Sequence, residues 1–139
     1  MASEISTQIE LHRPYGGVVP ELASRNHILH LQPLVQAALK QAGCTLDDMH
    51  AIAATAGPGL VSSLLMGNTA AKSLALCLKK PFLAVNHLEG HLLSPFIGNA
   101  DAVKPGIALI VSGGHTLLIH LRGVGKYEIL PSKPLFTPQ

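Results

Sequence analysis

The sequence predicts an α/β fold, because two patterns of secondary structure follow one another along the chain. Up to about residue 92, runs typical of buried strands alternate with runs of helical spacing; beyond it, strand-type runs follow one another and are joined by glycine turns. Of the 139 residues, 47% are apolar and 13% are charged, which is enough apolar material for a sizeable core. The length favours one domain.

The first third of the chain predicts a short strand followed by a long helix. Apolar residues between positions 5 and 11 indicate an opening strand that ends near Pro14. Residues 19–42 carry apolar side chains at helical spacing, and Gly43 supplies a C-terminal stop. Pro33 lies inside this run and removes one backbone donor. We therefore expect a kink there, or two abutting helices.

The middle of the chain predicts a strand, a helix and a second strand. Residues 45–48 are typical of a capped helical turn. Residues 50–56 indicate a buried strand, which the sequence Gly-Pro-Gly at 57–59 ends. Residues 60–78 predict a helix, and residues 82–85 another short strand.

The last third begins with a helix that opens at His87 and continues as a run of strands. We expect the strands at residues 107–112, 116–121 and 127–130. Glycines at 113–114 and 123–125 supply the turns between them. The final segment, 131–139, contains three prolines and no periodic pattern, so we expect a tail.

Charge and hydropathy limit the classes of function. The formal net charge is +2, with no run of like charges, which gives no electrostatic sign of nucleic-acid binding. The longest apolar run, 60–78, is interrupted by polar residues, so no membrane span is expected, and the N-terminus lacks the pattern of a secretory signal. Cys44 and Cys77 are far apart and fit reduced structural thiols. We expect a soluble, cytoplasmic protein.

His87 and His91 form a candidate metal site. Side chains four residues apart lie on the same face of a helix, and zinc, iron and nickel all accept imidazole nitrogen. The alternative is a pair of surface imidazoles with no ligand, which composition alone can supply. The zinc-protease motif is excluded, because Glu89 lies roughly 200° around the helix from His87.

Two glycine turns are candidate anion sites. Gly113 and Gly114 follow an apolar strand and can leave backbone N–H groups free for a phosphate or an acyl-adenylate; the alternative is a tight hairpin turn. The turn at 57–59 leads into a helix N-terminus, where the helix dipole favours negative charge. It lacks the lysine and the spacing of a Walker A motif, so we interpret it as a structural turn.

The segment 72–92 resembles the signature of the family once called O-sialoglycoprotein endopeptidases, now known as the TsaD/Gcp tRNA threonylcarbamoyltransferases. The matching positions are Lys72, Ser73, Leu78, Pro81, Leu83, His87, Gly90, His91 and Leu92. Three further blocks resemble the bacterial branch of that family: YGGVVPELASRNH from Tyr15, TAGPGLVSSLLMG from Thr55 and ALIVSGGHTLLI from Ala108. Four blocks in the family's order make the resemblance specific.

The resemblance covers Ser3 to Leu130 and implies the fold of the actin-like ATPases (ASKHA), in which two ribonuclease-H-like lobes close on a nucleotide and a metal. Residues 3–130 are similar to part of the N-terminal lobe, and 131–139 form a tail that does not resemble the family. In the family a first strand with a phosphate loop precedes the equivalent of Ser3, and a second lobe follows the equivalent of Leu130. We therefore expect an α/β lobe that is incomplete at both ends.

The resemblance also implies a function: transfer of the threonylcarbamoyl group from threonylcarbamoyl-AMP to N6 of the adenosine next to the anticodon of tRNAs that read ANN codons. It makes His87 and His91 ligands of one divalent metal ion, iron by family preference and zinc as second choice. The residues that it places against the acyl-adenylate are Ile110, Val111, Ser112, Gly113 and Gly114.

The implied partners are the tRNA, a TsaB-like paralogue that docks on the helix within 21–42, and a TsaE-like ATPase. The alternative is a non-catalytic lobe that retains only the TsaB-like partner. Two protein ligands make a weak metal site. A single lobe also leaves one wall of a nucleotide cleft unbuilt, so we expect this chain not to complete the transfer even when a TsaB-like partner, the adenylate and tRNA are supplied.

Overall fold

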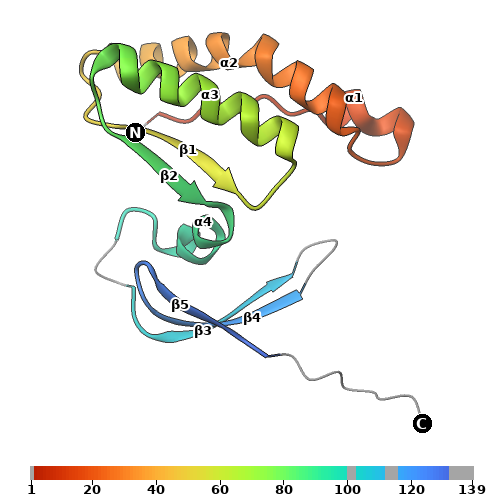
Figure 1. Cartoon of the computed structure of the whole chain (residues 1–139), viewed down its shortest axis with the longest axis vertical. Coiled ribbons are helices and arrows are strands. Elements are labelled where there is room, and N and C mark those ends of the chain that lie inside the picture. Colours follow the sequence, from red (N-terminus) through yellow and green to blue (C-terminus); the bar gives the residue numbers. More distant parts are fainter. Residues whose placement is uncertain (1, 100–102, 112–115, 132–139) are drawn as a thin grey trace. The chain divides into compact units, whose positions relative to one another are not determined.

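The computed structural model describes residues 2–99, 103–111 and 116–131 (Figure 1). The chain divides into two compact units, Met1–Asn86 and His87–Gln139, called here the N-terminal unit and the C-terminal unit. The length alone favoured one domain, whereas the contacts between residues divide the chain into these two units. The assignment of 3–130 to one family lobe and of 131–139 to a tail remains a prediction.

The N-terminal unit opens with helix rather than with the expected strand. α1 spans Ile9–His12 and the 3-10 helix η1 spans Arg13–Tyr15, so the predicted strand at 5–11 is wrong. The apolar residues that suggested a strand, Ile5, Ile9 and Leu11, are all exposed, and Ile5 lies before the helix begins. The alternation of apolar residues here does not mark a buried sheet face.

The long helix, α2, spans Pro20–Ala42 as one helix, with Pro33 inside it, so the alternative of two abutting helices is wrong. Its ends follow the sequence: Val19 is the N-cap, proline occupies the first turn, and Gly43 closes the helix in the left-handed conformation with φ of 66°. After it, the carboxylate of Asp48 accepts hydrogen bonds from the backbone N–H and the hydroxyl of Thr45, both at 2.8 Å. These bonds lower the pKa of Asp48. They confirm the cap, but residues 45–48 form a turn and not a helix, so the helical part of the prediction is wrong.

β1 (Ile52–Gly57), α3 (Val61–Leu78) and β2 (Phe82–Asn86) form a strand–helix–strand unit, as the sequence predicts. The two strands pair in parallel, with Ile52 opposite Phe82. α3 packs against β1 and also contacts α2, so both helices cover the sheet from one side (Figure 1). The buried residues of the two helices are small: Ala23 on α2, and Ala71 and Ala75 on α3.

The C-terminal unit joins a short helix to an antiparallel sheet. α4 spans His87–Leu93, the 3-10 helix η2 spans Ser94–Phe96, and the strands are β3 (Gly106–Val111), β4 (Thr116–Gly123) and β5 (Lys126–Leu130). The strand order is β3-β4-β5, each pair antiparallel, and α4 contacts β3. Its buried apolar residues are Leu92, Ile119 and Leu121.

α3 is the one helix among the described residues that is long and apolar enough to cross a bilayer, with a mean hydropathy of 1.2 over 18 residues. This is a statement about length and composition, and a single helix of this kind is weak evidence for a membrane span. Its packing against β1 and α2 gives it protein neighbours inside the N-terminal unit.

Candidate metal centre and substrate loop

The two candidate ligands stand at the start of α4. β2 ends at Asn86 and the helix begins at the next residue, so both imidazoles belong to one short helix and both are exposed. Their Nε2 atoms are 3.3 Å apart, their ring centroids are 4.5 Å apart and the ring planes meet at 70°. The expectation that His87 and His91 lie on one face and approach a common point is confirmed.

This separation of the Nε2 atoms suits one metal ion. Two nitrogens bound to tetrahedral zinc at about 2.0–2.1 Å lie roughly 3.3 Å from each other. Without metal, one ring donates Nε2–H to the lone pair of the other, and which ring donates depends on the tautomers. Metal binding instead requires a lone pair on both Nε2 atoms, with the protons on Nδ1. The side-chain positions therefore fit a metal without rearrangement of the helix.

The described residues supply two ligands at this point, which is half of a tetrahedral coordination shell. Within residues 2–99, 103–111 and 116–131, no group of three or more His, Cys, Asp or Glu side chains is placed to hold a metal ion. Two imidazoles suit zinc, iron or nickel equally by ligand type. The geometry therefore fits a divalent metal, and the role of His87 and His91 as ligands remains a prediction.

Of the predicted substrate segment, the structure describes Ile110 and Val111, the last two residues of β3. Ile110 lies opposite Leu117 and Val111 opposite Thr116 in the β3–β4 pair. The other predicted contacts, Ser112, Gly113 and Gly114, lie outside the described residues, as does His115. Their contact with an acyl-adenylate remains a prediction.

Sequence reasoning missed one contact of α4. The Glu89 carboxylate accepts a hydrogen bond from the backbone N–H of Gly125, with Oε1 and N separated by 2.9 Å. The partners are 36 residues apart, and Gly125 lies in the turn between β4 and β5. No local sequence pattern predicts a contact between residues so far apart in the chain. The carboxylate is engaged with the hairpin, in agreement with the exclusion of a zinc-protease base.

The turn after β1 connects the end of this strand to α3. Asn68 of α3 donates through Nδ2 to the carbonyl oxygens of Thr55, at 2.7 Å, and Leu64, at 2.9 Å. This amide ties the helix to the end of the strand on the far side of the Gly57–Gly59 turn. Helix α3 itself has no side-chain hydrogen bond at its N-cap, Leu60. The interpretation of this turn as a strand-to-helix connection agrees with these contacts.

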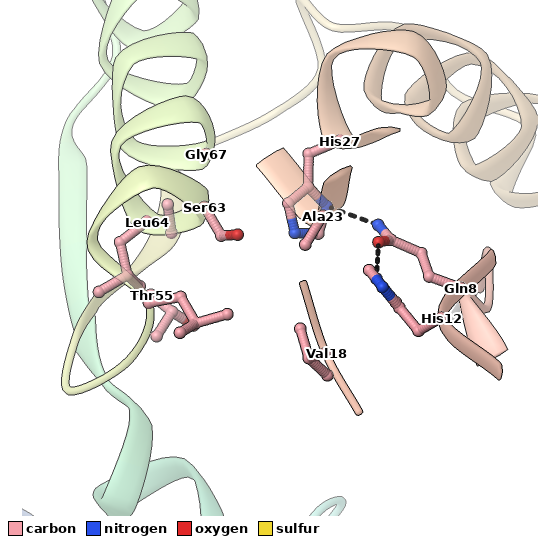
Figure 2. Close-up of a pocket in the computed structure, with 11 residues that line it drawn as sticks. Gln8, His12, Val18, Ala23, His27, Thr55, Ser63, Leu64 and Gly67 are labelled. Carbon is pink, nitrogen blue, oxygen red and sulfur yellow. Dashed lines mark hydrogen bonds between the residues drawn. The ribbon is translucent and has the colours of Figure 1, made fainter. Parts of the chain in front are cut away.

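A cavity of about 410 Å³ lies in the N-terminal unit and is lined by residues of α1, α2, β1 and α3 (Figure 2). The backbone N–H of Val19 donates to Nδ1 of His12 at 3.3 Å, so the proton of a neutral His12 is on Nε2. His12 Nε2 donates to Gln8 Oε1 at 3.2 Å, and Gln8 Nε2 then donates to Nδ1 of His27 at 3.4 Å. The Val19 N–H can donate a hydrogen bond but cannot accept one, so it fixes the donor and the acceptor at each later step of this relay.

This relay decides whether the cavity holds a catalytic serine. The buried Ser63 hydroxyl has no hydrogen-bond partner among the described residues, and Figure 2 shows it on the cavity wall that faces α2. His27 comes from α2, and because its Nδ1 accepts from Gln8, a neutral His27 carries its proton on Nε2. In this state the ring has no lone pair left to act as a base. The arrangement therefore does not activate Ser63 as a nucleophile.

His12 is expected to support the fold rather than the chemistry. Replacing this buried residue with alanine removes the partner of the Val19 N–H at the start of α2, and we expect unfolding free energy to fall by about 1–3 kcal/mol. Chemical denaturation measures the change. The control is His27→Ala, an exposed residue of the same relay, which should cost less than about 0.5 kcal/mol. Equal losses in the two variants would contradict the assignment.

Comparison with known proteins gives a family and a fold. The model of the family described as TsaD, tRNA N6-adenosine threonylcarbamoyltransferase, matches residues 1–134. Two solved structures resemble the chain. YeaZ from Pseudomonas aeruginosa has 24% sequence identity to this chain and a TM-score of 0.55, and the match covers 81% of this chain and 58% of the YeaZ chain. A protein from the same organism, described as similar to peptidase YEAZ, has 24% identity, a TM-score of 0.56 and coverages of 81% and 55%.

These matches confirm the predicted fold class, an α/β arrangement of the actin-like ATPase type. At 24% identity the two structures show the fold alone. The chain spans little more than half the length of either one, at 58% and 55%.

Proposed function

Since the chain belongs to the family of tRNA N6-adenosine threonylcarbamoyltransferases, we propose that it holds a divalent metal and threonylcarbamoyl-AMP for the modification of tRNA. The family is one of transferases that act on tRNA. The finer proposal is transfer of the threonylcarbamoyl group to N6 of the adenosine beside the anticodon. The observation that carries it is the 3.3 Å separation of the His87 and His91 Nε2 atoms.

The residues of the chain have separate roles in this proposal. His87 and His91 hold the metal, iron by family or zinc, which when bound supplies a Lewis acid next to the acyl group. The β3–β4 hairpin positions the adenylate through residues 110–114. The N6 amine of the tRNA attacks the carbamoyl carbon, AMP leaves with the bond electrons, and the amine loses a proton. The protein needs no nucleophile of its own, in agreement with the unactivated Ser63.

A second candidate function is a non-catalytic lobe that binds a TsaB-like partner. The observation in its favour is the outer face of α2 and α3. Ile28 and Leu29 are exposed there, and a cavity of about 460 Å³ between the helices has apolar lining from Leu31 and Met66. Exposed apolar patches of this kind mark interaction surfaces.

The proposed setting for either function is the cytoplasm, with a TsaE-like ATPase as a further partner.

Binding of the adenylate tests the first proposal. A non-hydrolysable threonylcarbamoyl-adenylate analogue is titrated into the chain with and without zinc, by calorimetry. We expect binding that needs both zinc and the histidine pair, and therefore a loss of binding in the double variant His87→Ala, His91→Ala. Binding that is indifferent to zinc and to the double substitution would remove the metal from the site.

Product formation separates the two candidates. The chain is incubated with tRNA, threonylcarbamoyl-AMP, a TsaB-like protein and a TsaE-like ATPase, and the tRNA nucleosides are then analysed. Modified adenosine that disappears with the histidine double variant supports catalysis by this site. Absence of product, together with co-elution of the chain and the TsaB-like protein, is the result expected of a non-catalytic lobe.

A further inference from the structure

The hydrogen bond between Glu89 and Gly125 connects α4 to the β4–β5 turn within the C-terminal unit. Oε1 lies 2.9 Å from the Gly125 nitrogen. Gly125 has φ of 68°, in the left-handed region that favours glycine, so its N–H is presented by a turn of fixed shape. The bond therefore attaches the middle of α4 to a rigid point of the sheet.

α4 needs such an attachment because it is short. The helix has seven residues, and isolated helices of fewer than about 12–15 residues are not stable in water. Its helical conformation must therefore be stabilised by tertiary contacts. Leu92, which is 4% exposed, supplies an apolar one. Glu89 supplies a directional one, which an apolar contact cannot replace, because hydrogen bonds depend on angle.

The positions around the helix show what this bond controls. Successive residues turn by about 100°, so His87 and His91 lie about 40° apart on one face and Glu89 lies about 160° from His91. The carboxylate thus holds the helix from the side opposite the imidazoles. It leaves both rings exposed while it stabilises the helical turn that sets their spacing.

We propose that Glu89 is the positioning residue of the histidine pair: by accepting the Gly125 N–H, it holds α4 in its helical conformation and so keeps the two imidazoles at the spacing that one metal ion needs. This inference rests on the proposed metal-binding role of His87 and His91. Glu89 is not a ligand in it, because its carboxylate points away from the face that carries the rings.

Two substitutions at Glu89 separate position from charge. Glu89→Ala removes the acceptor, whereas Glu89→Gln removes the charge but keeps a carbonyl oxygen that can accept the same N–H. The matched control is Glu128→Ala on β5, which removes an equal charge in the same unit. Glu128 forms an ion pair with Arg122 of β4, at 2.7 Å.

Two readouts without metal test the geometry. Amide hydrogen exchange by NMR should show Gly125 exchanging about 10-fold faster in Glu89→Ala, and close to the rate of the unsubstituted chain in Glu89→Gln and in the control. The cross-relaxation signal between ring protons of His87 and His91, whose centroids are 4.5 Å apart, should weaken in Glu89→Ala alone. Circular dichroism checks that each variant is folded.

Zinc affinity, measured by competition with a chromophoric chelator, is the third readout. We expect about a 10-fold loss in Glu89→Ala, the lower end of the range typical for removal of a group that orients a metal ligand. The loss should be less than about 3-fold in Glu89→Gln and in the control. An equal loss in Glu89→Ala and Glu89→Gln would assign Glu89 a role through charge and overturn the proposal.

The readouts also distinguish failure of this inference from failure of the proposed function. Unchanged Gly125 exchange and unchanged ring proximity in Glu89→Ala would overturn the positioning role, whatever the metal result. Conversely, the ring proximity could depend on Glu89 while the zinc affinity is unchanged by His91→Ala. The positioning role of Glu89 would then be retained. That second result would remove the metal from the site.

Discussion

Replacing His91 with alanine is expected to abolish site-specific metal binding by this chain. The described residues offer two imidazoles for the site, with Nε2 atoms 3.3 Å apart, so the substitution removes half of the protein ligands. The affinity for zinc should fall by more than about 100-fold, beyond the loss caused by perturbing groups that merely orient ligands. Competition titration with a chelator measures it. The unsubstituted chain should itself bind loosely, because catalytic zinc sites ordinarily use three protein ligands.

The matched control is His30→Ala on α2, which removes an exposed imidazole from the N-terminal unit and should leave the affinity unchanged. It separates a built site from adventitious binding to any of the eight histidines. Equal affinities in His91→Ala and in the unsubstituted chain would contradict the metal centre. Zinc that stays bound to the unsubstituted chain in excess chelator would instead show ligands beyond the two imidazoles.

Replacing Ile119 with alanine is expected to destabilise the C-terminal unit by about 2–4 kcal/mol, because it leaves a cavity in a small core. Ile119 is 1% exposed and is the largest fully buried side chain among the described residues. The described residues of this unit include three buried apolar side chains, Leu92, Ile119 and Leu121, so the loss is a large fraction of the free energy of folding that a small domain has. Unfolding in urea measures it through the fluorescence of Tyr127, in a Tyr15→Phe background where no other tyrosine contributes.

Ile107→Ala is the control for the core substitution, because it makes the same chemical change on β3 at a residue that is 63% exposed. It should cost less than about 0.5 kcal/mol. Hydrogen exchange of the β1 amides should be unaffected by Ile119→Ala if the two units have separate cores. Equal destabilisation by the two substitutions would contradict the assignment of Ile119 to the core.

Local sequence signals predicted most elements correctly where one residue type dictates the backbone. Gly43 ends α2, as expected of a residue that tolerates the left-handed conformation. The expected helix at 60–78 and strand at 82–85 are present as α3 and β2, within one residue at each boundary. The strand expected at 5–11 was wrong. A few spaced apolar residues indicate a strand only where they can pair with a neighbouring strand and pack against a core.

For the candidate site too, some features follow from the sequence and others from the tertiary structure. The sequence by itself determined that His87 and His91 share a helical face, since a spacing of four residues is a property of any α-helix. It also determined the family, through blocks of residues that match in order. Only the tertiary structure decided that the chain divides into two compact units, and that Glu89 reaches Gly125. It also decided that His12, Gln8 and His27 form one relay, fixed in direction by the Val19 N–H. The Glu89–Gly125 bond joins residues 36 apart and the Gln8–His27 bond joins residues 19 apart. Which groups meet over such separations depends on how the elements pack, and no local periodicity encodes it.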